Sequence, residues 1–307
     1  MTGYGVVLGE ALIDLLESSA GGELVYRPAV GGAPFNVAVG IARLGADVHF
    51  LGSFGDDPFG HRLLDFLDKS GVGTDGARTV PHVATTLAVT TFQGHEPTFC
   101  FYGDPPSYGL LDASDVDERL VAGARLLYCG SMCLLAPPVL AAARKAWAIP
   151  GPVRVFDPNV RPIVGLNPDV VEEFAATADL VKLSSADATA LWNESPEQAA
   201  ARLLGAGAGV VVVTLGAQGA LVAKGPSTVL VPAPRITPVD ATGAGDATMA
   251  GLSWGILSHG KPDDLGGWAT LTRVAVHVAG LVCESPGGAV SMPTVGDLRA
   301  RFDDLAV

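Results

Sequence analysis

The sequence predicts an α/β protein with a central, mostly parallel sheet and a small β appendage. Short apolar runs alternate with amphipathic segments along most of the chain, which is the pattern of the βα units that build a parallel sheet. Two segments break this alternation with a period of two residues, which indicates strands that have one buried face. The 307 residues suffice for about two domains, or for one large domain with an appendage.

Mostly apolar runs of four or five residues are typical of strands buried on both faces of a sheet. They occur at residues 5–9, 48–52, 124–128, 153–156, 180–183 and 210–214. Helical spacing of apolar residues occurs between them, at 35–44, 59–70, 138–148, 169–176, 185–193 and 197–205. The chain then continues into a predicted β-meander at 220–223 and 228–231, and into helices at 247–258 and 271–283.

The appendage is expected from residues 11–30 and 84–103, whose alternating patterns predict antiparallel strands outside the main sheet. A turn is expected at residues 94–96. No linker rich in Pro or Ser separates independent units, so the appendage is predicted to belong to one α/β body.

The charge balance argues against polyanionic partners. The 19 Lys and Arg against 32 Asp and Glu give a formal net charge of −13, which repels nucleic acids and anionic membrane surfaces. Glu10 and Asp14 interrupt the first apolar stretch, so no signal peptide is expected and a cytoplasmic location is predicted. The uncharged stretches 126–143 and 203–223 contain prolines or glycines, which favours buried strands over membrane spans. The cysteines lack metal-binding spacing and are predicted to be buried thiols: Cys100, Cys129, Cys133 and Cys283.

Gly243-Ala244-Gly245-Asp246 is the strongest candidate for a functional site, because it stands at the start of a predicted helix. Small residues let the backbone close around an anion, and unpaired N–H groups with the helix dipole supply partial positive charge. A phosphate could therefore bind there, with Asp246 accepting a proton from a substrate hydroxyl. The alternative is a glycine-rich turn whose Asp only caps the helix.

A second turn, Gly31-Gly32-Ala33-Pro34, opens another predicted helix. Adjacent glycines allow close backbone approach, and Pro is favoured in a first helical turn. Asn36 follows and can donate and accept hydrogen bonds at once, as binding of a polyol requires. Taken alone, such a turn is more often structural than functional.

Five segments of the sequence carry a resemblance to a known family. They are Glu10-Ala-Leu-Ile-Asp14, residues 31–51 with the continuation Gly55-Asp-Asp-Pro-Phe-Gly60, Asp157-Pro-Asn-Val-Arg161, Thr214-Leu-Gly-Ala-Gln-Gly219 and Asp240-Ala-Thr-Gly-Ala-Gly-Asp246. In this order they resemble the ribokinase-like (PfkB) sugar kinases, most closely the fructokinase and 2-keto-3-deoxygluconate kinase branches. The resemblance implies a single kinase domain over residues 1–307, with a ribokinase-like three-layer αβα fold and a β lid formed by about 11–30 and 84–103.

The resemblance assigns roles around the sugar. Asp246 would be the catalytic base, and the N–H groups of Gly243, Ala244 and Gly245 would form an anion hole for the transferred phosphoryl group. The substrate-binding residues would be Asp14, Gly31, Gly32, Asn36, Tyr102 and Arg161. Tyr102 could instead belong to the core of the lid, and Arg161 could instead form a surface ion pair.

The resemblance also implies ATP, Mg²⁺ and K⁺ as cofactors. ATP would lie across the carboxyl ends of the later strands, the usual crevice of open α/β sheets. Its binding residues would be Asn159, Ser184, Asp187, Thr214, Gly216, Gly219 and His277. His277 could instead be a core residue of an apolar helix. A K⁺ site beside the anion hole would comprise Asp240, Thr242, Ser285, Gly287 and Ser291.

The sequence departs from the family's pattern in two places. Ser184 and Asp187 stand where the family frequently has an Asn-x-x-Glu motif that organises Mg²⁺-bound water. Gly103 stands where fructokinases and 2-keto-3-deoxygluconate kinases usually have an Arg, a natural partner for the carboxylate of a sugar acid. The second departure argues against an acidic substrate.

The sequence is therefore interpreted as an ATP-dependent kinase of a primary hydroxyl on a small sugar, with fructose as the first choice. Ribose, 2-keto-3-deoxygluconate and nucleoside kinases of the same family are alternatives. Another is a catalytically silent, sugar-binding regulatory homologue, which the two departures favour and the intact turn at 243–246 disfavours. An NAD-dependent dehydrogenase fits poorly, because neither glycine turn gives GxGxxG after the first strand. The lid could also pair two subunits through an exposed strand edge.

Overall fold

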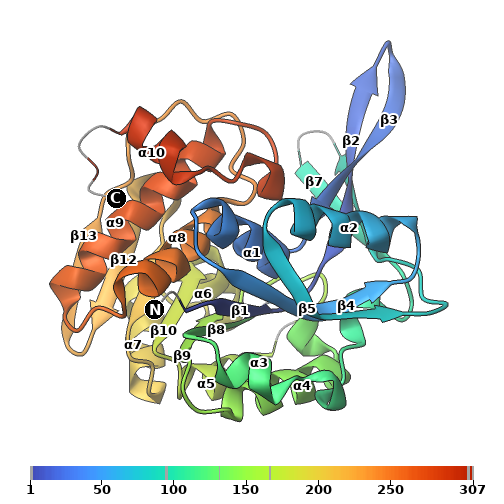
Figure 1. The fold of residues 1–307 in the computed structure, drawn as a ribbon. Coiled ribbons are helices and arrows are strands. Elements are labelled where there is room, and N and C mark those ends of the chain that lie inside the picture. Colours follow the sequence, from blue (N-terminus) through green and yellow to red (C-terminus); the bar gives the residue numbers. More distant parts are fainter. Residues whose placement is uncertain (1–2, 94–95, 131, 166, 303–304, 306–307) are drawn as a thin grey trace.

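A large sheet lies between two layers of helices in the computed structural model, which describes residues 3–302 and 305 apart from 94–95, 131 and 166 (Figure 1). The strand order is β13-β12-β11-β10-β9-β8-β1-β4-β5. The strands from β5 to β11 in this order all pair in parallel with their neighbours. The last two pairs, β11 with β12 and β12 with β13, are antiparallel. The strands are β1 (Gly5–Leu8), β4 (Val48–Gly55), β5 (Val72–Val80), β8 (Leu126–Gly130), β9 (Val153–Asp157), β10 (Leu180–Ser184), β11 (Val211–Thr214), β12 (Ala220–Lys224) and β13 (Ser227–Val231).

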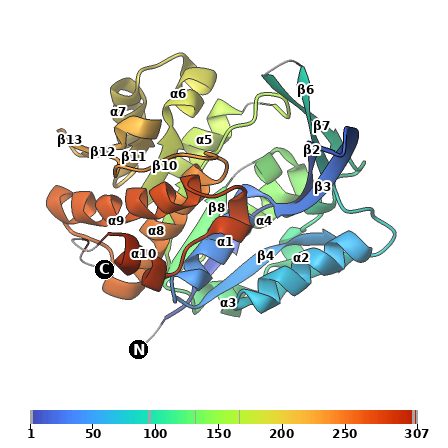
Figure 2. The same cartoon turned by 90° about the horizontal axis from the view of Figure 1, so that it is seen from above.

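Helices cover both faces of this sheet, which confirms the three-layer α/β prediction (Figures 1 and 2). One face carries α1 (Ala33–Arg43), α2 (Pro58–Lys69), α8 (Ala244–His259), α9 (Leu265–Cys283) and α10 (Val295–Arg301). The other carries α3 (Glu118–Ala122), α4 (Pro137–Ala148), α5 (Pro168–Ala175), α6 (Ser185–Trp192) and α7 (Pro196–Ala206). Successive residues of β1 enter different cores, with Val7 on the α1 side and Val6 on the α4 side.

The sequence prediction missed or shortened several elements. Strand β5 escaped notice because it carries Asp75 and Arg78 and is an edge strand with only partial burial. Helices α3 and α10 are too short to show a clear apolar period. Helix α9 begins at Leu265 rather than at residue 271. This helix is apolar and long enough to span a membrane by composition, but it packs against α8 and the α1-side core.

A second, small sheet with the order β3-β2-β6-β7 projects from the body (Figure 1). It comprises β2 (Leu12–Ala20), β3 (Glu23–Gly31), β6 (Leu87–Gln93) and β7 (Glu96–Tyr102). Each predicted segment forms an antiparallel hairpin, as expected. The two hairpins join through their first strands, β2 and β6, which pair in parallel, so the small sheet is mixed. The turn expected at 94–96 falls largely on residues outside the described part of the chain.

The register of the small sheet defines two faces. Asp14 lies beside Ala88 of β6, which in turn lies opposite Phe101 of β7, so these residues share one face, here called the inner face. The outer face carries Tyr26 and Tyr102.

All four cysteines are free thiols, and the prediction that they are buried holds for Cys129 and Cys133. It was wrong for Cys100, which is exposed on the outer face of the small sheet, and Cys283 is half-buried near the end of α9.

Candidate active site

The glycine turn predicted to bind an anion forms the first turn of α8. Gly243 precedes the helix with a φ of 83°, and a Cβ there would lie 2.9 Å from Cα of Gly288, so only glycine fits. The Ala244 N–H, a predicted member of the anion hole, donates to the carbonyl of Ala241 at 3.1 Å. Within the described part of the chain, the N–H groups of Gly243, Gly245 and Asp246 have no acceptor. These three groups are therefore available to an anion.

Asp246 lies buried in this turn and contacts Asn36 of α1. The Asn36 Nδ2 donates to Oδ2 of Asp246 at 2.7 Å, which joins two helices far apart in the sequence. Burial raises the pKa of Asp246 to about 6, while the Asn36 hydrogen bond and the positive charge of Lys182 act in the opposite direction. A carboxylate with such a pKa is suited to accept a proton near neutral pH.

Asp14 on β2 faces the same space from the small sheet. Burial raises its pKa to about 6, the charge of Arg161 opposes that rise, and the charge of Asp246 adds to it. Gly31 is needed beside it, because a Cβ there would clash with Oδ2 of Asp14. Gly32 has a φ of 108°, and its Cβ would lie 2.5 Å from the Glu10 carbonyl oxygen. The two glycines therefore allow the carboxylate and the start of α1 to approach each other.

Comparison with known proteins decides the family. Residues 4–295 match the family described as pfkB family carbohydrate kinase. The chain belongs to this family. It is 34% identical to a fructokinase of Klebsiella pneumoniae over 97% of the chain and 99% of that protein.

Solved structures agree with this assignment. A fructokinase with bound ATP from Xylella fastidiosa superposes with a TM-score of 0.91 at 27% identity, over 99% of both chains. A fructokinase of Vibrio cholerae in a fructose-, ADP- and calcium-bound form superposes with a TM-score of 0.85 at 28% identity, over 97% of this chain and 98% of the other. The protein is thus a PfkB carbohydrate kinase, a phosphotransferase that acts on a sugar hydroxyl.

Asp187, one of the residues predicted to bind ATP, is tied to the loop that follows β9. Its Oδ2 accepts from the Ser184 N–H and hydroxyl at 2.8 and 2.7 Å, and its Oδ1 accepts from the Val160 N–H at 2.9 Å. Arg161 donates to Oδ1 of Asn159 at 2.7 Å. The two predicted motifs, at 157–161 and 184–187, therefore form one connected unit beside the carboxyl ends of β9 and β10.

Three further residues predicted to bind ATP, Thr214, Gly216 and Gly219, lie at the end of β11 and beyond it. The Thr214 hydroxyl donates weakly to the Leu183 carbonyl at 3.5 Å. Gly216 has open space where a Cβ would stand, whereas a Cβ on Gly219 would clash with the backbone of β13. Gly219 is therefore explained by packing, and Gly216 leaves room at the strand end.

His277 is half-buried on α9. Its Nδ1 lies 2.6 Å from the Arg273 carbonyl oxygen, and its ring meets that of Phe302 edge-on at 4.6 Å. The side chain thus packs between α9 and the end of α10.

The position of Tyr102 differs from the prediction that it binds substrate. Tyr102 lies on the outer face of the small sheet, whereas Asp14 lies on the inner face. It is 57% exposed there. Phe101 shares the face of Asp14 and is the aromatic residue that the sequence reasoning missed. The doublet Phe101-Tyr102 offers an aromatic side chain to both faces, so only the register distinguishes them.

The residues predicted for K⁺ lie in two segments that meet at Gly243 and Gly288. The Asp240 carboxylate accepts from the Thr242 N–H at 2.9 Å, and the N–H of Asp240 donates to the Cys283 carbonyl at 3.2 Å. The Ser291 hydroxyl donates to the Gly288 carbonyl at 2.9 Å. These bonds hold carbonyl-rich turns, which include Ser285 and Gly287, beside the anion turn, and oxygen donors suit a hard cation.

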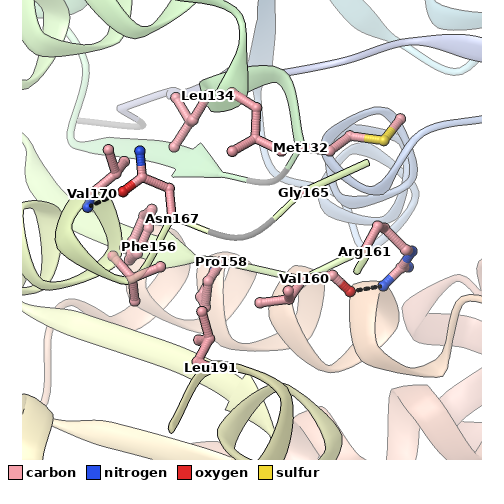
Figure 3. A pocket seen from close by; sticks show the side chains of 12 residues that line it. Met132, Leu134, Phe156, Pro158, Val160, Arg161, Gly165, Asn167, Val170 and Leu191 are labelled. Atoms are coloured by element: carbon pink, nitrogen blue, oxygen red, sulfur yellow. Dashed lines mark hydrogen bonds between the residues drawn. The ribbon is translucent and has the colours of Figure 1, made fainter. Parts of the chain in front are cut away.

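A small apolar cavity of about 40 Å³ lies beneath the loop of Arg161 (Figure 3). Its walls include Met132, Phe156, Val160 and Leu191, and the Arg161 guanidinium turns back toward the Val160 carbonyl at 3.1 Å. The cavity has room for water molecules but not for a sugar. Its walls therefore support the loop and do not form the substrate site.

Lys182 and Asp157 form a buried ion pair that was not predicted as part of the site. The Lys182 Nζ lies 2.7 Å from Oδ2 of Asp157, and the two side chains are 3% and 0% exposed. The signal for it is a lysine inside an apolar strand, between Val181 and Leu183, where a charged side chain needs a partner.

Proposed function

We propose that the protein is an ATP-dependent fructokinase. The observation that carries the proposal is the buried Asp246, which Asn36 holds at the first turn of α8, near enough to Asp14 for the two carboxylates to interact electrostatically. The Klebsiella and Xylella relatives are fructokinases, and the latter binds ATP. We extend their activity to this chain because it keeps the buried Asp246 with its glycine turn, and Asp14 and Asn36 beside it.

The reaction would proceed as follows. Asp14 and Asn36 would hold the sugar so that a primary hydroxyl lies between Asp246 and the γ-phosphorus of ATP. The hydroxyl oxygen would form a bond to phosphorus while the bond to the β,γ-bridging oxygen breaks, with the proton passing to Asp246 and ADP leaving. The free N–H groups of Gly243, Gly245 and Asp246 would stabilise the charge on the transferred phosphoryl oxygens.

The residues present also fit the proposed ions. Mg²⁺ would neutralise charge on the ATP phosphates, and Oδ1 of Asp187 has a lone pair left to hold a water of its shell. K⁺ would be held by the turns around Asp240 and Gly287, beside the anion turn. The net charge of −13 makes such local cations necessary for a polyphosphate to bind.

The surroundings of Gly103 support a neutral sugar. Its φ is 123°, and a Cβ there would lie 3.2 Å from the Thr86 hydroxyl oxygen, so an arginine does not fit without a change of backbone. The cation that would pair with a sugar-acid carboxylate is therefore absent at this position. This observation favours fructose over 2-keto-3-deoxygluconate.

A coupled assay of ADP release tests the function. With ATP and Mg²⁺, with and without K⁺, we expect fructose to give the highest kcat/KM in a panel that also contains ribose, 2-keto-3-deoxygluconate and adenosine. Without Mg²⁺, turnover should vanish. If no compound in the panel is phosphorylated while calorimetry shows sugar binding, the protein is instead a silent sugar-binding homologue.

We further propose that the small sheet acts as the lid of a single domain over residues 1–307 and also pairs two subunits. As a lid it would exclude water from the sugar, which protects ATP from hydrolysis. Its outer face exposes Leu24, Tyr26 and Tyr102 by 64%, 40% and 57%, which are large apolar or aromatic side chains of the kind found at interfaces. The thiols Cys129 and Cys133 are consistent with a cytoplasmic location.

Light scattering coupled to gel filtration checks the pairing. The wild type is expected to elute as a dimer, and Leu24→Glu combined with Tyr26→Glu should give a monomer because it places like charges across the interface. Ser18→Glu, on the inner face of the same hairpin, is the matched control and should stay dimeric. A monomeric wild type would refute the interface.

A further inference from the structure

Lys182 holds a positive charge directly behind the anion turn. The side chain rises from β10 into the layer between the sheet and α8, where it pairs with Asp157 of the neighbouring strand. A Cβ on Gly245 would lie only 3.2 Å from the Lys182 Nζ. The ammonium therefore stands against the backbone of the turn that carries Asp246, and the glycine permits this close approach.

The ammonium stays charged in spite of its burial. Burial lowers the pKa of Lys182, but the charges of Asp157, Asp187 and Asp246 raise it, and their combined effect leaves it above its ordinary value. One cation thus serves several carboxylates in a nearly water-free layer. There, a charge interacts far more strongly than at the surface.

We propose that Lys182 is a positioning residue for the transfer step: its buried charge keeps the Asp246 carboxylate in the form that accepts a proton, and Asp157 limits that effect. The proposal rests on the proposed function, because it concerns the base of that reaction. It assigns a role to a buried cation that lies close to the turn and does not itself touch the sugar or the phosphates in the proposed transfer.

The other groups around Asp246 define what changes to expect. Asn36 donates to it, Arg161 attracts its negative charge, and the neutral, buried Tyr128 lies near it. Asp14 and Asp157 repel it. Among these charges Lys182 acts most strongly on the pKa of Asp246. Loss of Lys182 should therefore raise that pKa, and loss of Asp157 should lower it.

Two substitutions with opposite expected effects test the proposal. Lys182→Met keeps an unbranched side chain only one atom shorter and removes its charge, and we expect the acidic limb of kcat against pH to move up by about one pH unit. Asp157→Asn keeps an acceptor for the Asn159 N–H and leaves Lys182 unopposed, so the limb should move down. Saturating sugar is required, because Asp14 also has a raised pKa and acts on sugar binding.

A general loss of structure would not shift the limb in two directions. The proposal would be overturned if the acidic limb of kcat stood at the same pH in all variants. It would also be overturned if Lys182→Met and Asp157→Asn moved the limb in the same direction. If Lys182→Met does not fold because Asp157 is left unpaired, the double variant Lys182→Met with Asp157→Asn removes both charges, and a limb between those of the wild type and Lys182→Met is expected.

A second readout separates this proposal from the proposed function. The ¹³C resonance of the Asp246 carboxyl, assigned with Asp246→Asn, can be titrated in the resting protein without substrates. Opposite shifts of its midpoint in the two variants support the proposal even if no sugar is phosphorylated, and an unmoved midpoint contradicts it. Failure of the substrate panel, in contrast, refutes only the kinase reaction.

Discussion

Asp246→Asn should lower kcat by about 10²–10⁴-fold, the contribution typical of a general base. The asparagine keeps an oxygen that accepts from Asn36, so the turn and the contact between α1 and α8 are expected to persist. The dissociation constant for fructose, measured by calorimetry, should stay within about threefold. The asparagine can still hydrogen-bond to the sugar hydroxyl, and one such bond contributes only about 1 kcal/mol. Asp263→Asn, on the loop before α9, is the matched control. A variant that keeps more than about a tenth of the wild-type kcat would remove Asp246 from the role of base.

The same substitution should stabilise the protein at neutral pH. The folded-state pKa of Asp246 is about 6 and its ordinary value is 3.8, because burial disfavours the charged form. The wild type therefore loses free energy of unfolding as the pH rises from about 4 to 6, by up to roughly 3 kcal/mol. Asp246→Asn lacks that loss, so its melting temperature should exceed that of the wild type by several degrees at pH 7.5 and match it near pH 4. If the difference in melting temperature between the variant and the wild type is the same at both pH values, Asp246 is not ionised while buried.

Asp14→Ala should raise the KM for fructose by about 10²-fold or more and leave the KM for ATP nearly unchanged. A buried carboxylate that accepts two sugar hydroxyls loses charge-assisted hydrogen bonds worth roughly 1.5–3 kcal/mol each. Because Asp14 stands on β2 and the motifs proposed to bind the nucleotide stand at the ends of β9 to β11, the effect should be confined to the sugar.

Ser18→Ala is the control for changes in the small sheet, because Ser18 lies farther along β2 on the same face as Asp14. Its kinetics should equal those of the wild type. Similar increases in KM for fructose and ATP in Asp14→Ala would indicate a general disturbance of the cleft and not a sugar contact.

The parts of the site that could be predicted are those fixed by local chemistry. Glycine before a predicted helix indicates close backbone approach, and the structure gives Gly32 and Gly243 a positive φ. Each of the two precedes a helix whose first turn carries a polar side chain. Asn36 and Asp246 could therefore be predicted as site residues from the sequence. Their hydrogen bond could not, because it depends on the packing of α1 against α8.

The parts that escaped prediction depend on pairing between distant segments. Tyr102 and Phe101 are equivalent in an aromatic doublet until the register with β6 places them on different faces. The Ala244 N–H belongs to the anion turn by sequence, but the local turn directs it to Ala241. Lys182 stood within a predicted strand, and only the neighbouring strand β9 supplies the partner that explains it.

The parallel pairing of β2 with β6 has a consequence for the order of folding. Ile13 pairs with Leu87, and the chain between them contains β3, α1, β4, α2 and β5. The two hairpins can join only after this intervening part of the body has brought their bases together, since contacts of such sequence separation form late. Asp14 lies at that junction. During refolding, the fluorescence of the buried Trp268 in the body should recover first, and fructose binding should return last.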